Sequence, residues 1–253
     1  MNDRAVSRGL YLAPFDELSD PAVLVELAVH AEERGWDGVF LWDHIVYRDP
    51  VSAVADPWVA LSAIAARTRK LRLGPLVTPL SRRRVQKVAR ETVTLDHLSG
   101  GRLIFGVGLG SPYELEPFGE VVDGRERARR LDERLVRLGE FWSGEFAPRP
   151  LQRPRVPVWV AAVWPHRRPV WRAVRWDGLF PIELPGPTAL TELAEEIERE
   201  RDGGLSRFDL VVGVSAGDDP APWHQAGATW VLTAFGKQPR VADVRQAIER
   251  GPR

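Results

Sequence analysis

The chain has 253 residues, of which 44% are hydrophobic, so it can bury a full core in one α/β barrel or in two smaller domains. Thirty-five basic residues balance thirty-five acidic ones, and this zero net charge disfavours nucleic acid and anionic membrane surfaces as partners. The lack of cysteine excludes disulfides, thiol nucleophiles and zinc–thiolate sites. We therefore expect a small-molecule ligand, and a cytoplasmic location because no apolar signal core or membrane-length apolar run is found.

Short apolar or β-branched runs alternate with helical patterns along the chain, which is typical of βαβ units joined into a parallel sheet. The runs lie at residues 9–13, 38–42, 71–77, 103–109, 156–163, 178–182, 210–214 and 230–234. Neither half of the chain has enough strands to close a sheet, so we read the proline-rich stretch 146–157 as a surface loop and not as a linker. The pattern predicts a single (β/α)8 TIM barrel that forms one domain over residues 1–253.

The first two predicted helices have clear start signals. Asp20-Pro21 and Asp56-Pro57 each place a capping acid before a proline at the first helical position. Apolar residues then recur at helical spacing, for example Leu24, Leu27 and Ala28. These signals fix where the first two strand-to-helix loops must end.

The segment FLWDH, residues 40–44, ends a predicted strand with an acid and a histidine. In a (β/α)8 barrel the reactive face lies at the carboxyl ends of the strands, so Asp43 and His44 should border its mouth. Histidine suits proton transfer or hydrogen bonding to a ligand because its charge changes near neutral pH. The alternative is that the pair only caps the following loop.

Two further strands end in residues that favour a close approach of the backbone. Gly106, Gly108 and Gly110 lack side chains, so a flat or anionic ligand could lie against the main chain there, although tight barrel packing explains glycine too. The stretch 102–110 is not a dinucleotide fingerprint, because Pro112 and a loop follow it in place of a helix. Prolines in LGPLVTPL, residues 73–80, predict a bend or bulge at the mouth.

The segment VWPHRRP, residues 163–169, follows the fifth predicted strand and opens a helix. Arg167 and Arg168 beside a helix N-terminus would suit a phosphate, while the alternative is ordinary solvation of surface arginines. The five histidines show no metal-binding spacing, so no metal site is predicted.

Four segments together, AEERGWDGVFLWDH, DPWVALSAIAARTRKLRLGPLVTPL, ETVTLDHLSGGRLIFGVGLG and PVWVAA followed by VRWDGLFP, resemble the luciferase-like monooxygenase family of flavin- and F420-dependent oxidoreductases. The resemblance covers residues 9–181 and is weaker after residue 187. It implies a compact luciferase-like barrel that holds FMN, or its deazaflavin analogue F420, at the carboxyl face. It also implies that His44 lies beside the isoalloxazine ring, that Pro75-Leu76 matches a cis-peptide bulge, and that Thr78, Gly108 and Gly110 line the site.

Two positions depart from the family pattern. Val163, Trp164 and Pro165 stand where many relatives have a glycine- and serine-rich phosphate loop. Ser111 stands where F420-dependent sugar dehydrogenases have a glutamate, and Glu114 is the nearby candidate for that acid. The loop 111–124 is the candidate lid over the substrate.

These inferences define a predicted site and function. The function is that of an oxidoreductase, a monooxygenase first, which uses reduced FMN, or F420 as hydride carrier, on a small organic substrate. A non-catalytic flavin-binding barrel is the alternative, and an isomerase or aldolase ranks below both. The resemblance implies a homodimer, and a flavin reductase is a further expected partner. The predicted residues are His44 as catalytic; Trp42, Asp43, Pro75, Leu76, Thr78, Gly108, Gly110, Ser111, Trp164, Arg167 and Arg168 as cofactor-binding; and Tyr113 and Glu114 as substrate-binding.

Overall fold

The computed structural model describes residues 5–120 and 123–252, and its strands form one parallel sheet. The strand order is β3-β2-β1-β9-β8-β7-β6-β5-β4. The strands are β1 (Ser7–Leu12), β2 (Gly38–Leu41), β3 (Arg72–Pro75), β4 (Thr78–Pro79), β5 (Phe105–Gly108), β6 (Val158–Val163), β7 (Gly178–Ile182), β8 (Asp209–Ser215) and β9 (Trp230–Ala234).

The two ends of this sheet meet and close a barrel. Leu73 of β3 bridges Leu103, the residue two before β5, and the Ile104 amide donates to the Leu73 carbonyl at 2.9 Å. β3 and β4 are consecutive pieces of one barrel strand, so the nine segments make up the eight strands of the barrel. We call each of these eight barrel strands a stave. The predicted (β/α)8 barrel is confirmed.

The strand predicted at 71–77 is broken at Leu76–Val77, where the peptide bond is cis. Pro75 and Pro79 flank the break, and neither can donate a ladder hydrogen bond. The predicted bend therefore exists, and the cis bond lies one peptide beyond Pro75-Leu76.

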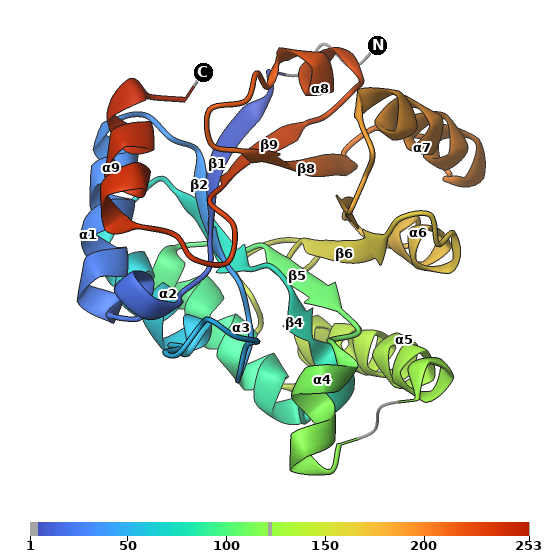
Figure 1. The fold of residues 1–253 in the computed structure, drawn as a ribbon. Coiled ribbons are helices and arrows are strands. Elements are labelled where there is room, and N and C mark those ends of the chain that lie inside the picture. The colour runs from blue at the N-terminus through green and yellow to red at the C-terminus, as the bar shows by residue number, and fades with distance from the viewer. Residues whose placement is uncertain (1–4, 121–122, 253) are drawn as a thin grey trace.

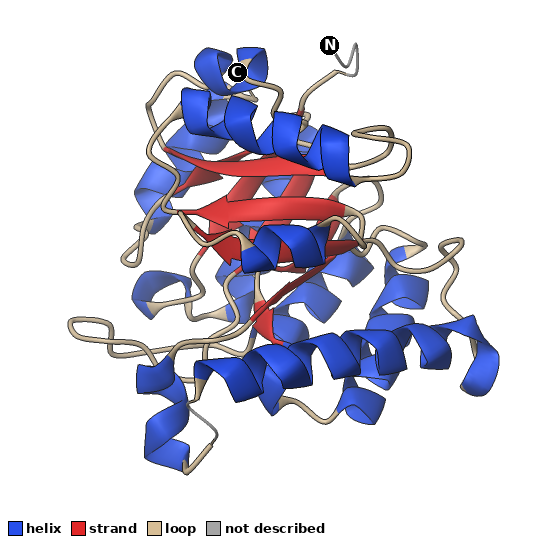
Figure 2. Cartoon of the chain, turned by 90° about the vertical axis from the view of Figure 1, so that its right-hand side faces the viewer, coloured by secondary structure: helices blue, strands red, loops and turns tan. Residues whose placement is uncertain are grey.

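A helix follows each stave and covers the outside of the barrel (Figures 1 and 2). The predicted caps are confirmed, since Asp20 accepts from the Ala22 amide and Asp56 accepts from the Trp58 and Val59 amides. The helices are α1 (Pro21–Glu33), α2 (Pro57–Arg67), α3 (Val85–Ser99), α4 (Pro112–Leu115), α5 (Gly124–Glu140), α6 (Arg168–Ala173), α7 (Pro187–Glu200), α8 (Ala221–Gln225) and α9 (Val241–Arg250), with short helical turns at Asp16–Leu18, Leu80–Arg82, Glu116–Phe118 and Phe141–Glu145.

The inside of the barrel is filled with large side chains. Phe40, Trp159 and Trp230 pack together with ring centroids 5.0 to 5.6 Å apart. Tyr11, Val77, Ala161 and Ile182 pack against this interior cluster and are only partly buried. Tyr11, Ala161 and Ile182 each lie two residues after an inward-facing position of the same strand, so they also face inward, one layer nearer the carboxyl end. This upper layer forms the floor of the mouth.

Glycine at the closure is required by packing. A Cβ on Gly74 would lie 1.8 Å from the Ile104 carbonyl oxygen, and one on Gly106 would lie 2.5 Å from the Pro75 carbonyl oxygen. The bent stave can therefore approach β5 only because neither position carries a side chain.

The stretch 146–157 is a loop fixed to the barrel wall. Asp96 of α3 accepts from the Leu151 amide at 2.6 Å and from the Gln152 side chain at 2.8 Å. The strands before and after this loop belong to the same sheet.

In the described residues, none of the helices has the length and apolar character that crossing a membrane requires.

Candidate functional site at the carboxyl mouth

Asp43 follows β2 and is buried, with 3% of its surface exposed. Its Oδ2 accepts hydrogen bonds from the Thr78 hydroxyl at 2.6 Å and the Trp58 indole at 3.0 Å. The Arg83 guanidinium donates to both carboxylate oxygens, at 2.9 and 3.0 Å. Asp43 thus ties β2 to the β4 stave and to α2, and both it and the Thr78 hydroxyl are occupied by protein partners.

His44, the next residue, is paired with Glu114 of α4. The His44 Nδ1 lies 3.1 Å from Glu114 Oε2, and the Ile45 amide donates to Glu114 Oε1 at 2.6 Å. Arg82 Nη1 lies 3.0 Å from the same Oε1. Because a carboxylate only accepts, Nδ1 carries the proton in this pair and Nε2 is left for another partner.

Glu114 is buried, with 1% exposed, yet it is held as a carboxylate. Burial raises its pKa, but the hydrogen bonds from His44 and Ile45 and the charges of His44 and Arg82 outweigh burial and set the pKa below its ordinary value. Glu114 therefore orients His44 and does not serve as a proton donor near neutral pH. It also fixes α4, in the predicted lid, onto the loop after β2.

Aromatic rings surround His44 on several sides. Tyr47 packs edge-on at 5.0 Å between centroids, and Phe15 and Trp42 each lie 6.0 Å away. Tyr113 contacts Tyr47 at 6.0 Å. Burial, with Tyr47 and Glu114 nearby, raises the pKa of Tyr113 to about 12, so this phenol stays protonated. These rings form a mostly apolar wall around His44, in which the tyrosine hydroxyls are hydrogen-bond donors.

The glycines at the end of β5 and just beyond it, Gly108 and Gly110, are explained by packing within the protein. A Cβ on Gly108 would lie 2.7 Å from a methyl of Val77, and one on Gly110, whose φ is +74°, would lie 2.7 Å from Pro79. Arg127 of α5 donates to the Gly110 carbonyl at 2.6 Å. The end of β5 is thus held against the bend between β3 and β4. Ser111 follows and leads directly into α4.

The loop after β6 lies apart from this cluster. Arg167 stacks over Trp164 at 4.5 Å and lies 3.3 Å from Glu196 of α7. Arg168 is exposed and begins α6, which has only six residues. A phosphate site at these arginines stays a prediction.

The structure brings together His44 and Glu114 of the predicted site, with Asp43 beside them, but sequence reasoning missed several neighbours. All three tyrosines of the chain, Tyr11, Tyr47 and Tyr113, gather there, and this concentration of a rare residue type was an available signal. No sequence signal distinguishes Arg82 and Arg83 from the many other arginines.

The mouth offers donors that suit an organic cofactor with acceptor atoms. The Trp42 indole and Arg82 Nη2 are buried without a hydrogen-bond partner in the described part of the chain. Buried donors are normally satisfied, so these two are consistent with a ligand that supplies oxygen or nitrogen acceptors. Across residues 5–120 and 123–252, no group of three acidic or histidine side chains could hold a metal ion.

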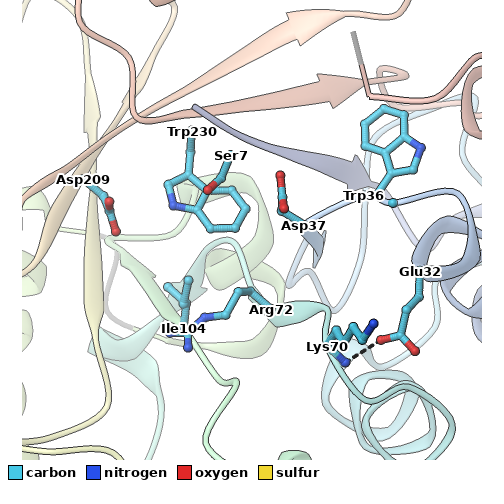
Figure 3. A pocket seen from close by; sticks show the side chains of 10 residues that line it. Ser7, Glu32, Trp36, Asp37, Lys70, Arg72, Ile104, Asp209 and Trp230 are labelled. Carbon is cyan, nitrogen blue, oxygen red and sulfur yellow. Dashed lines mark hydrogen bonds between the residues drawn. The ribbon is translucent and has the colours of Figure 1, made fainter. Parts of the chain in front are cut away.

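A cavity of about 550 Å³ opens at the opposite, amino end of the strands (Figure 3). Its two acids Glu32 and Asp37 already have partners: Glu32 accepts from the Arg69, Lys70 and Leu71 amides, and Asp37 accepts from the Arg8 amide. Four further lining residues, Ser7, Arg72, Asp209 and Trp230, begin their strands. This cavity lies where barrels are stabilised and not where they react.

A filled (β/α)8 barrel with an oriented histidine at its carboxyl mouth is the arrangement in which enzymes of this fold place their reactive groups. The chain belongs to the luciferase-like monooxygenase family, whose model matches residues 7–246.

Several relatives in the sequence comparison are named as F420-dependent enzymes. The F420-dependent glucose-6-phosphate dehydrogenase of Beutenbergia cavernae is 32% identical over 246 residues, which cover 87% of this chain and 72% of that protein. The enzyme of the same name from Nakamurella multipartita is 38% identical over 130 residues, which cover 49% of this chain and 38% of that protein. The match to the uncharacterized protein y4wF of Sinorhizobium fredii spans 61% of its length at 34% identity.

Solved structures share the fold. An F420-dependent secondary alcohol dehydrogenase, in complex with an F420–acetone adduct, has a TM-score of 0.80 at 18% identity and covers 97% of this chain and 98% of its own. Monooxygenase RslO1 from Streptomyces bottropensis has a TM-score of 0.71 at 20% identity, and the match covers 98% of this chain and 80% of that protein's chain.

Proposed function

We propose that the chain is an oxidoreductase that moves a hydride between F420 and a small organic substrate at the carboxyl mouth. The observation that carries the proposal is the pair of His44 and Glu114, which occupies Nδ1 and leaves His44 Nε2 without a partner in the described residues. The F420-dependent relatives favour this cofactor over FMN.

The side chains of the mouth divide the chemistry among them. Bound F420 would supply the site that accepts or donates the hydride. When an alcohol is oxidised, His44 Nε2 takes the hydroxyl proton, and in the reverse direction it returns that proton. Glu114 stabilises the resulting imidazolium, while Trp42, Tyr47 and Tyr113 exclude water.

Oxygenation with reduced FMN is the second candidate, favoured by the matching family, which is named for monooxygenases. In that case a flavin reductase is the expected partner, and the aromatic wall would shelter the reactive intermediate from water. The expected homodimer is tested separately by light scattering.

Absorbance titration with F420 and with FMN tests the proposal. F420 should show a perturbed band and tighter binding than FMN, and the reverse order would favour oxygenation. His44→Ala should bind cofactor but lower turnover by about a hundredfold or more. Binding without any turnover in the wild type would instead identify a non-catalytic flavin-binding barrel, and a spectrum perturbed by neither cofactor would contradict both functions.

A further inference from the structure

Tyr11 is placed differently from the other side chains of β1. It belongs to the upper layer of the barrel interior, and its ring packs against Trp42 at 5.4 Å and edge-on against Phe180 at 5.3 Å. Part of its surface remains accessible, and Val77, Ala161 and Ile182 pack against the same interior cluster. Its ring is therefore fixed on two sides below the space that a ligand must occupy.

Among the residues that the structure describes, no hydrogen-bond partner is found for the Tyr11 hydroxyl. Burial, with the nearby Tyr47, raises the pKa of Tyr11 above its ordinary value, so the phenol keeps its proton. A protonated phenol on an apolar floor is a donor in want of an acceptor. The neighbouring Trp42 indole is a second unpartnered donor.

We propose that the Tyr11 hydroxyl is a ligand-facing donor that hydrogen-bonds an acceptor oxygen at the mouth floor. This inference rests on the proposed function. A carbonyl oxygen of the cofactor ring and the oxygen of the reacting substrate have the same chemistry, and the two sources are distinguished by experiment. The alternative is that Tyr11 only packs, in which case phenylalanine would serve equally well.

Fluorine NMR tests the hydroxyl directly. Because the chain has three tyrosines, incorporation of 3-fluorotyrosine gives three signals, and the one absent from Tyr11→Phe belongs to Tyr11. We expect that signal to move when F420 is added if the cofactor is the partner. If the substrate is the partner, it should move only when cyclohexanone is added to the F420 complex.

Affinity measurements on Tyr11→Phe complete the test, since this variant keeps the ring contacts and loses only the hydroxyl. The dissociation constant of the matching ligand should rise about fivefold to tenfold, while the melting temperature stays unchanged. The control Thr191→Val removes a hydroxyl on the exposed side of α7 and should change neither affinity.

An unmoved Tyr11 signal with both ligands, or a moved signal without weaker binding in Tyr11→Phe, overturns the inference while the proposed function stands. Absence of cofactor binding to the wild type overturns both.

Discussion

At the scale of single residues, adjacent positions at the end of β2 have opposite tasks. Asp43 is saturated by Thr78, Trp58 and Arg83, whereas His44 meets one carboxylate and, among the described residues, has no partner at its other nitrogen. Because successive side chains of an extended segment point in opposite directions, one residue can fasten the strand end while its neighbour serves the mouth. In the proposed function, the position of His44 therefore depends on a neighbouring residue whose own side chain is occupied by protein partners.

We predict that Asp43→Ala destabilises the protein by about 3 kcal/mol, because it leaves Arg83 and the Trp58 indole without their buried acceptor. Urea unfolding measures this change. The control Asp20→Ala removes an exposed helix cap and should cost about 1 kcal/mol. Equal losses in the two variants would show that Asp43 is only a cap.

Strand-end position was sufficient to predict Asp43 and His44 from sequence. The partners of Asp43 were not predictable, because they lie 15, 35 and 40 positions further along the chain and meet only when the barrel closes. Glu114 was found as a neighbour of Ser111, but its contact with His44 spans 70 positions. Tyr11 precedes all of the motifs and resembles any strand aromatic.

At the scale of elements, α4 is fastened to the loop after β2 through Glu114 and through Tyr113, whose ring packs against Tyr47. Glu114 holds the His44 ring and the Ile45 amide together, and Arg82 balances its charge. Figure 1 shows α4 near the end of β4 and beside α5. The predicted lid, 111–124, thus contains a helix where a loop was expected, and Val121 and Val122 of that stretch lie outside the described residues.

We predict that α4 loosens in acid. The folded pKa of Glu114 is below its ordinary value, so its contribution is complete above about pH 4.3, the unfolded value, and is lost as pH falls through the lower folded pKa. The Ile45 amide should show a protection factor in hydrogen exchange that is several-fold higher in the wild type than in Glu114→Gln at pH 7.

This difference should disappear below the folded pKa. Identical protection at pH 7 would mean that the Glu114 charge does not hold the helix.

At the scale of the whole molecule, the alternation of apolar runs and helices predicted all eight staves. Two of them, 178–182 and 230–234, match their observed bounds. The bent stave was the exception, because its prolines interrupt the hydrogen bonds that define a strand. Closure itself is invisible in local patterns, since it joins Leu73 to Leu103.

We predict that Gly74→Ala prevents proper closure. Its Cβ would overlap the Ile104 carbonyl, which is backbone and cannot rotate away, so we expect a loss of about 3 kcal/mol or insoluble protein. The control is Gly139→Ala on α5, where nothing lies within 4 Å of the new carbon. It should gain about 0.5 to 1 kcal/mol in the same thermal melts. A stable Gly74→Ala protein would show that the barrel does not close by the contact of Gly74 with Ile104.

The packed rings of Phe40, Trp159 and Trp230 fill the inside of the barrel between the mouth and the cavity at the amino end of the strands. None of these three side chains is ionisable, so they offer no group that could pass a proton from one end of the barrel to the other. At the mouth, by contrast, 20% of the His44 side chain is exposed. In the proposed reaction, His44 would therefore exchange its proton with solvent at the mouth and not through the barrel.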